Sequence, residues 1–259
     1  MAASPFVWYE LMTSDPAAAA AFYTGVVGWQ AADSGMPGVD YTVLSAGPSM
    51  IAGLMALPEH LVAEGVPPHW IGYVGVDDVD AKTAELQRLG GQLHKAPEDI
   101  PGVGRFAVVA DPHGAAFCLF RGQPAEGEAA PQPPAPGTPG AMGWHELMAG
   151  ELEAAWAFYS TLFGWTKDEA IDLGAVGVYQ LFRADAAHAI GGMMTRPPQV
   201  PVPGWLYYVN VDAIDAAVAR VKAGGGTVVN GPMQVPGGSW VAQALDPQGA
   251  MFALVAPGR

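Results

Sequence analysis

Short apolar blocks separated by turn residues dominate the start of the chain. Residues 6–12 are apolar and rich in aromatic side chains, which is typical of a β-strand. Asp15 is an N-cap candidate and Pro16 suits the first helical position, so the pattern predicts a helix over residues 17–27. Gly28 is expected to end that helix, because glycine accepts the left-handed conformation that follows many helices.

The same order of elements occurs twice before residue 121. Strands at residues 41–45 and 50–57 surround the turn residues Gly47-Pro48 and complete a strand-helix-strand-strand module, with room for one more strand. The elements predicted in the second module are a strand at 70–76, a helix from Asp77 or Asp78 through Leu89, strands at 105–110 and 115–120, and a hairpin turn at Asp111-Pro112-His113-Gly114.

The whole arrangement then returns in the second half of the chain. Separated landmarks recur at a nearly constant offset, which indicates a duplication. Trp8–Met12 and Phe22-Tyr23 return as Trp144–Met148 and Phe158-Tyr159, and Val76-Asp77 and Asp111–Gly114 return as Val211-Asp212 and Asp246–Gly249. We predict a first domain over residues 1–121, a Pro/Ala/Gly-rich linker over 122–143 and a second domain over 144–259.

Strand-helix-strand-strand modules joined by hairpins indicate an α+β fold rather than a doubly wound parallel sheet. Helix Ile214 to Ala223, ended by Gly224, and strands around Val241 and Phe252 repeat the design in the second half. No glycine-rich phosphate-binding motif follows a strand at the start of a helix, so nucleotide binding by those routes is not expected.

Composition and charge exclude several classes of partner. The 259 residues are 51% apolar and 14% charged, with a formal net charge of −14, which disfavours nucleic acid and anionic membranes. Cys118 is the single cysteine, so no intramolecular disulfide forms and a reducing compartment is expected. The first residues resemble no signal peptide, and no apolar run reaches the ~18 residues of a membrane span. These features predict a soluble cytoplasmic protein.

The repeated motifs resemble the vicinal oxygen chelate superfamily, which includes glyoxalase I, bleomycin-resistance proteins and extradiol dioxygenases. The resemblance covers nearly the whole chain apart from the linker. It implies two tandem domains, each a pair of βαβββ modules forming a cup-shaped mixed sheet. The residues that carry it are Asp15, Phe22-Tyr23, Gly28-Trp29, Val76-Asp77, Gly90-Gly91 and Asp111–Gly114, with their second-half counterparts.

The resemblance also implies where a metal would bind, and the chain departs from the family there. Metal enzymes of the superfamily place His, Gln or Glu ligands on strands that line the cup. The corresponding positions here are Trp8, Ile71 and Cys118 in the first half and Trp144, Leu206 and Ala253 in the second, with a fourth near Met55 or Met194. Divalent metals need several converging donors, so we expect no metal and no cofactor.

Two glutamates are the candidate catalytic residues. Strand alternation places Glu10 beside Trp8 and Glu146 beside Trp144, on the face that lines the cup. A carboxylate beside a large aromatic ring is suited to act as a general acid or base. The alternative is a glutamate near a strand end that pairs with a backbone or basic group.

Aromatic and apolar side chains are the candidate ligand-binding residues, with simple core packing as the alternative. His145 is expected to point away from the cup, and Cys118 to face it as an inert buried thiol. Trp70 and Tyr207 are also considered as pocket walls. The ligand-binding set comprises Trp8, Trp144, Tyr73, Tyr208, Ile71, Leu206, Cys118, Met55 and Met194.

Four functions compete at this point. The first is a metal-free protein that binds a small aromatic or hydrophobic metabolite or drug. The second is a metal enzyme of the glyoxalase I or ring-cleaving type, and the third is a metal-independent enzyme, such as an isomerase, hydratase or hydroxylase, that uses Glu10 or Glu146. The fourth is an interaction protein with a degenerate pocket. Since a duplicated chain mimics the dimer of single-copy relatives, we expect a monomer or a weak homodimer.

Overall fold

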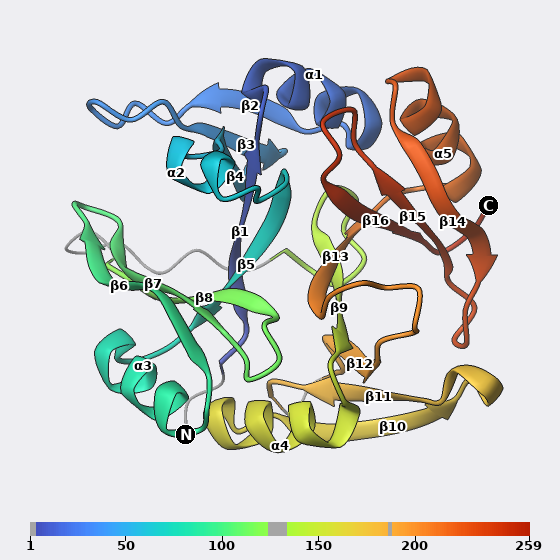
Figure 1. Ribbon diagram of the computed structural model, residues 1–259. Coiled ribbons are helices and arrows are strands. Elements are labelled where there is room, and N and C mark those ends of the chain that lie inside the picture. The colour runs from blue at the N-terminus through green and yellow to red at the C-terminus, as the bar shows by residue number, and fades with distance from the viewer. Residues whose placement is uncertain (1–3, 124–133, 186–187) are drawn as a thin grey trace. The chain divides into compact units, whose positions relative to one another are not determined.

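The computed structural model describes residues 4–123, 134–185 and 188–259 (Figure 1). Residues 124–133 of the predicted linker lie outside the described residues. The first repeat forms β1 (Phe6–Thr13), α1 (Pro16–Val27), β2 (Gln30–Asp33), β3 (Thr42–Ala46), β4 (Ser49–Ala56), α2 (Glu59–Ala63), β5 (His69–Gly75), α3 (Val79–Arg88), β6 (Gln92–Ile100), β7 (Gly104–Ala110) and β8 (Ala116–Gly122).

The second repeat follows the same plan. Its elements are β9 (Met142–Ala149), α4 (Leu152–Phe163), β10 (Thr166–Asp172), the short 3₁₀ turn η1 (Gly174–Val176), β11 (Val178–Arg183), β12 (Gly191–Thr195), β13 (Gly204–Asn210), α5 (Ile214–Ala223), β14 (Thr227–Gln234), β15 (Trp240–Leu245) and β16 (Met251–Ala256).

Each repeat supplies one eight-stranded mixed sheet. The strand orders are β2-β3-β4-β1-β5-β8-β7-β6 and β10-β11-β12-β9-β13-β16-β15-β14, so the two sheets have the same topology. Strands β1 and β4 pair in parallel, as do β5 and β8, whereas the hairpins are antiparallel. The predicted α+β class with tandem vicinal-oxygen-chelate architecture is confirmed.

Local signals at the helix ends act as the sequence predicts. The side chain of Asp15 accepts a hydrogen bond from the Ala18 amide, and Gly28 ends α1 in the left-handed conformation with φ +80°. In the second module Asp78, and not Asp77, is the N-cap of α3. Helix α5 has the bounds expected from its sequence.

Strand β6 was not among the predicted elements, for a physical reason. Its pattern is almost wholly exposed, and it contains Lys95, Pro97 and Glu98. It lies at the edge of its sheet, where charged residues and proline are tolerated because one side of the strand has no neighbour. The short β2 is likewise exposed along its length and lies at the other edge.

Contacts divide the chain into two compact units, and each unit contains parts of both repeats. One comprises Met1–Val7, Gly72–Gln132 and His145–Trp205, and we call it the α3–α4 unit. The other comprises Trp8–Ile71, Pro133–Trp144 and Leu206–Arg259, and we call it the α1–α5 unit. The sheets follow the sequence repeats, whereas the compact units combine halves of the two repeats.

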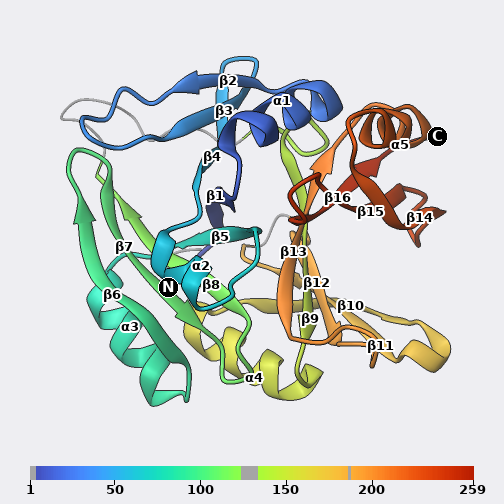
Figure 2. The ribbon, with the colours of Figure 1, turned by 45° about the horizontal axis from the view of Figure 1, so that its top comes forward.

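The core of the α3–α4 unit joins side chains from the two repeats. First-repeat residues such as Val79, Leu86 and Phe117 share one buried cluster with second-repeat residues such as Phe158 and Leu162. Helices α3 and α4 lie side by side in this unit (Figures 1 and 2). Burial of apolar surface is the main stabilising term, so this unit depends on both repeats for its stability.

The α1–α5 unit is built in the same way. Helices α1 and α5 lie side by side (Figure 1), and Phe22 of α1 packs edge-on against Phe252 of β16, with ring centroids 5.7 Å apart. Tyr23 also contacts Phe252, at 5.3 Å. Aromatic side chains of the first repeat therefore pack directly on a strand of the second.

The Phe-Tyr and Asp-Pro motifs meet in these cores. In the α1–α5 unit, the Trp70 indole donates to the Tyr23 hydroxyl at 2.9 Å, and that hydroxyl donates to Asp246 Oδ2 at 3.1 Å. Asp246 Oδ1 accepts from the backbone amides of Gln248 and Ala250 and so holds the hairpin turn closed. The two motifs that mark the repeat in the sequence are thus hydrogen-bonded partners.

The α3–α4 unit contains the same network. The Trp205 indole donates to the Tyr159 hydroxyl at 3.1 Å, and Tyr159 donates to Asp111 Oδ2 at 3.2 Å. Asp111 Oδ1 accepts from the amides of His113 and Ala115, which confirms the predicted hairpin turn. These buried residues stabilise the turn and the core.

Candidate functional site

Each sheet has one face toward the helices and one face away from them, and we call the latter the cup face. Trp70 and Phe252 contact side chains of α1, so their sequence neighbours Ile71 and Ala253 point to the cup face. The same alternation places Trp8 and Glu10 on the cup face of β1.

A tryptophan, a tyrosine and a glutamate gather on the cup face of the α1–α5 unit. The Trp8 indole donates to the Tyr41 hydroxyl at 3.0 Å. Gly53 of β4 is in register with Glu10 of β1, and a Cβ atom on Gly53 would collide with the Tyr41 hydroxyl. The Tyr41 ring therefore lies over Gly53, on the same face as Glu10, whose exposed fraction is 9%.

The α3–α4 unit repeats this arrangement with second-repeat residues. Glu146 of β9 is in register with Gly192 of β12, and a Cβ atom on Gly192 would collide with the Tyr179 ring. The two candidate glutamates thus share one environment, a tyrosine packed over a glycine on the adjacent strand. Tyr41 and Tyr179 are additions to the predicted set, and their recurrence near the start of the corresponding strands β3 and β11 was the available signal.

Three of the predicted ligand-binding residues meet on the second-repeat half of the α1–α5 unit. Leu206, Tyr208 and Ala253 form a buried cluster with Val241, and Trp144 packs against it from a partly buried position. This cluster is distinct from the helix-side packing of Phe252. It is an apolar patch with one hydroxyl group, that of Tyr208.

The α3–α4 unit carries the corresponding first-repeat patch. Tyr73 is in register with Cys118, and its ring lies 6.4 Å from that of Phe106 and 6.0 Å from that of Phe120. Lys95 Nζ lies 4.9 Å from the centroid of the Phe106 ring. Cys118 is buried, as expected of an inert thiol.

The remaining predicted residues are placed as follows. Met55 is in register with Met12 in the α1–α5 unit, and Met194 with Met148 in the α3–α4 unit. Ile71 is 2% exposed on β5.

Two aromatic residues considered as pocket walls belong to the helix-side core. Trp70 packs edge-on against Tyr23, and Tyr207 against Tyr9. Both point away from the cup face because alternate residues of a strand point to opposite faces, and Ile71 and Tyr208 hold the cup positions beside them. Burial raises the pKa values of both Tyr9 and Tyr23.

His145 lies in the core of the α3–α4 unit, as predicted from its neighbour Trp144. Its ring stacks on Phe6 with centroids 4.3 Å apart, and its Nδ1 lies 2.6 Å from the carbonyl oxygen of Ile190. Burial lowers the pKa of His145 to about 4, against a smaller opposing effect of the Ile190 carbonyl. The ring is therefore neutral at pH 7 and donates through Nδ1.

The positions that correspond to metal ligands do not offer a suitable donor set. The Trp8 nitrogen donates its proton to Tyr41, and an indole nitrogen has no lone pair for a cation. Ile71, Leu206 and Ala253 are hydrocarbon side chains. Within the described parts of the chain, no three His, Cys, Asp or Glu side chains are grouped so that they could hold a metal ion. The metal of the superfamily's metal-dependent members does not fit these residues.

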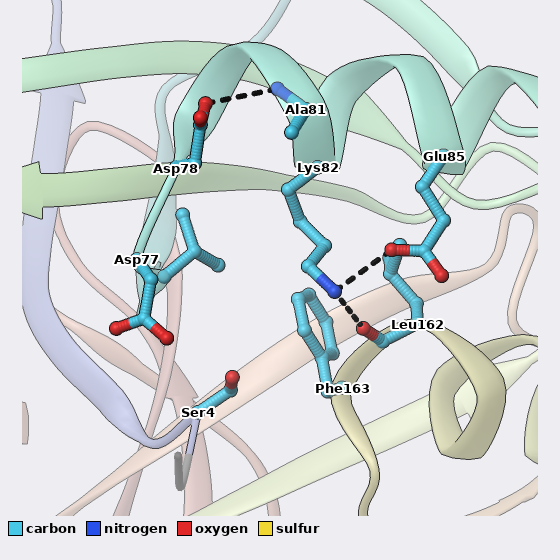
Figure 3. A pocket seen from close by; sticks show the side chains of 9 residues that line it. Ser4, Asp77, Asp78, Ala81, Lys82, Glu85, Leu162 and Phe163 are labelled. Atoms are coloured by element: carbon cyan, nitrogen blue, oxygen red, sulfur yellow. Dashed lines mark hydrogen bonds and ion pairs between the residues drawn. The ribbon is translucent and has the colours of Figure 1, made fainter. Parts of the chain in front are cut away.

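A hollow of about 260 Å³ lies elsewhere in the α3–α4 unit, between the start of α3 and the end of α4 (Figure 3). The Lys82 ammonium group extends into it and bonds to Glu85 and to the carbonyl oxygen of Leu162, both at 2.8 Å. Lys82 thereby caps the last turn of α4. None of the candidate residues lines this hollow, which we assign to helix packing.

Comparison with known proteins identifies the family. Residues 6–119 and 141–254 each match the model of the Glyoxalase/Bleomycin resistance protein/Dioxygenase superfamily. The chain therefore belongs to this superfamily, as its motifs indicate.

Curated relatives match nearly the full length of the chain. The chain is 34% identical over 253 residues to "Putative glyoxylase CFP32" of Mycobacterium tuberculosis. The match covers 96% of the chain and 94% of that protein. The chain is also 34% identical over 265 residues to "Anthracycline biosynthesis protein DnrV" of Streptomyces peucetius. This match covers 96% of the chain and 91% of that protein.

Solved structures support the fold. The Mn(II)-bound glyoxalase from Novosphingobium aromaticivorans superposes with a TM-score of 0.66 at 18% identity, over 98% of this chain and 81% of that one. The 2,3-dioxygenase LapB from Pseudomonas sp. KL28 superposes with a TM-score of 0.67 at 12% identity. That match covers 100% of this chain and 94% of LapB. Among the described residues, no helix is long and apolar enough to cross a membrane.

Proposed function

We propose that the chain is a binding protein that takes a planar aromatic or hydrophobic small molecule on its cup faces without a metal. The observation that carries the proposal is the replacement of the metal-ligand positions by Trp8, Trp144 and aliphatic side chains, with Tyr41 and Tyr208 beside them. Small-molecule sites typically combine apolar and aromatic walls with a few fixed polar groups.

The names of the relatives are consistent with this ligand class. Two relatives, at 33% and 34% identity, are named for anthracycline biosynthesis, and anthracyclines are polycyclic aromatic compounds. The proposal places the protein in the cytoplasm as a monomer. The mixing of both repeats within each compact unit supports the monomer, because one chain then supplies both partners of each core.

Equilibrium dialysis and thermal unfolding with 1-hydroxyanthraquinone and 1-naphthol test the proposal. We expect binding and a rise in melting temperature, because a ligand that binds only the folded state stabilises it. Trp144→Ala should weaken binding by about tenfold or more, since loss of a large apolar contact costs roughly 1.5–3 kcal/mol. Addition of EDTA should leave the affinity unchanged.

The control for this experiment is Trp156→Ala. Trp156 is a partly buried tryptophan of α4 that faces Lys167 rather than the cup face, so its removal should leave affinity within about twofold. Absence of binding by both aromatic compounds, or loss of binding on treatment with EDTA, would overturn the proposal.

A second candidate function is acid–base catalysis on the bound compound. The specific observation in its favour is that Glu10 and Glu146 each lie beside a glycine over which a tyrosine ring packs. A glutamate and a tyrosine on one face can act as general base and general acid on a compound bound between them.

Incubation with the bound aromatic compounds, followed by mass spectrometry, tests this second function. If product forms, Glu10→Gln should lower its rate by about 100-fold or more without changing the melting temperature. Glu146→Gln provides the matched change in the second repeat. Unchanged rates in both variants, or absence of any product, would rule out these glutamates as catalysts for these compounds.

A further inference from the structure

Four residues form a straight row across the cup face of the second repeat, within the α1–α5 unit. Tyr208 is in register with Ala253, Ala253 with Gln243, and Gln243 with Asn230. We call these residues the second row. In-register neighbours on adjacent strands point to the same face, so all four side chains share the cup face.

A chain of hydrogen bonds runs along this row. Asn230 Nδ2 donates to Gln243 Oε1 at 3.2 Å, and Gln243 Nε2 donates to the Tyr208 hydroxyl at 2.9 Å. Ala253 lies between Gln243 and Tyr208, and its single methyl group leaves space for the amide to reach the hydroxyl. The Gln243 amide is therefore held in one orientation beside the apolar cluster that contains Tyr208 and Trp144.

The first repeat has the corresponding row, in the α3–α4 unit, but not the hydrogen-bond chain. Its members are Tyr73, Cys118, Val108 and Lys95, paired in the same registers. Val108 replaces Gln243, so an aliphatic side chain interrupts any polar connection between Lys95 and Tyr73. The repeats have thus diverged at the position that orients an amide.

The walls of the two rows differ as well. Phe106 and Phe120 pack against Tyr73 in the first repeat. Val241 and Val255 occupy the corresponding strand positions beside Tyr208. Valine is smaller than phenylalanine and has no ring, so these two positions give Tyr208 aliphatic neighbours where Tyr73 has aromatic ones; both tyrosines are buried. Of the two rows, the second has both a chain of polar side chains and small aliphatic neighbours, Val241 and Val255.

Ala253 lies beneath the hydrogen bond between Gln243 and Tyr208. In the resemblance to metal-dependent relatives, this is a ligand position, and here the Tyr208–Gln243 hydrogen bond spans it. An amide and a hydroxyl fixed beside each other are suited to hydrogen-bond an oxygen atom of a ligand, and as uncharged groups they favour an uncharged ligand.

We propose that Tyr208 and Gln243 determine specificity by binding a hydroxyl or carbonyl oxygen of a neutral planar aromatic ligand whose ring packs beside Trp144. The proposal rests on the function proposed above and assigns the ligand-orienting role to the second repeat. Such a site binds oxygenated aromatic compounds more tightly than unsubstituted aromatic hydrocarbons. A site that merely buries apolar surface makes no such distinction.

Equilibrium dialysis of 1-naphthol and naphthalene against four proteins tests the inference. The proteins are the unaltered chain, Gln243→Leu, Tyr208→Phe and the matched first-repeat control Val108→Leu. The unaltered chain should bind 1-naphthol more tightly than naphthalene. Gln243→Leu and Tyr208→Phe should each weaken 1-naphthol binding by about tenfold and leave naphthalene binding within about twofold. Val108→Leu should change neither affinity.

The outcomes separate this inference from the proposed function. If the chain binds both compounds and Gln243→Leu and Tyr208→Phe retain full affinity for 1-naphthol, only the inference is overturned. If Val108→Leu weakens 1-naphthol binding while Gln243→Leu does not, the orienting row lies in the first repeat and the inference is also wrong. If the unaltered chain binds neither compound, the inference is overturned, and the proposed function is overturned as well only if 1-hydroxyanthraquinone also fails to bind. Circular dichroism establishes folding, and Tyr208→Phe decides the result if Gln243→Leu unfolds.

Discussion

Single glycines determine where the tyrosines beside the candidate glutamates lie. Gly53 and Gly192 each leave the space that a Cβ atom would take, and the rings of Tyr41 and Tyr179 fill it. Because each contact depends on how two successive strands pair, the order of residues along one strand does not reveal it. Glu10 was predictable on the cup face from strand alternation alone.

Another residue, His145, has a titration behaviour that only its surroundings explain. Its exposed fraction is 7%, and it is enclosed between the Phe6 ring and the Ile190 carbonyl. Burial lowers its pKa from 6.5 to about 4. Below pH 6.5 the unfolded chain therefore binds a proton that the folded chain does not bind, so folding loses stability as the pH falls toward 4.

We predict that His145→Phe reduces the acid sensitivity of folding. The unfolding free energy of the unaltered chain should fall between pH 6.5 and pH 4, with His145 contributing up to about 3 kcal/mol of that fall. The variant keeps an aromatic ring but has no proton to gain. Urea unfolding at several pH values measures the unfolding free energy of both proteins. Because the carboxylates titrate alike in both, their contribution cancels in the difference between the two free energies. Parallel pH profiles would contradict the buried, neutral histidine.

At the scale of elements, each hairpin turn of the Asp-Pro type is tied to a helix of the other repeat. Tyr23 of α1 donates to Asp246 in the turn before β16, and Tyr159 of α4 donates to Asp111 in the turn before β8. Burial raises the pKa of Asp246, whereas hydrogen bonds from the Ala250 amide and from Tyr23 oppose that rise. The turn thus depends on long-range as well as local bonds.

We predict that Tyr23→Phe lowers the unfolding free energy by about 1–3 kcal/mol, because it removes a donor from a buried carboxylate and an acceptor from Trp70. Tyr159→Phe should have a similar effect in the α3–α4 unit. Chemical unfolding of Tyr23→Phe, Asp246→Asn and the double variant gives the coupling energy. Strictly additive effects of Tyr23→Phe and Asp246→Asn would show that the hydrogen bond contributes nothing.

For the whole molecule, the two repeats share their cores. The buried cluster of the α3–α4 unit contains Leu86 and Phe117 from the first repeat and Phe158 and Leu162 from the second. The α1–α5 unit joins Phe22 to Phe252. A repeat taken alone would expose these side chains, and exposed apolar surface of that extent favours association or unfolding.

We predict that residues 1–121 and 144–259, expressed separately, do not fold as monomers, and that together they form a 1:1 complex. Size-exclusion chromatography with light scattering and thermal unfolding measures both properties. The intact chain, measured in the same way, is the reference. A single repeat that is monomeric and unfolds cooperatively would contradict the shared core.

The sequence by itself determined the duplication, the helix ends and the superfamily, because these follow from local signals: the cap at Asp15, the stop at Gly28 and motifs returning at a fixed offset. Only the tertiary structure decided that each core mixes both repeats, that Tyr41 lies over Gly53 and that Gln243 reaches Tyr208 across Ala253. These features depend on which strands pair and in which register, and such long-range choices leave no periodicity in the chain.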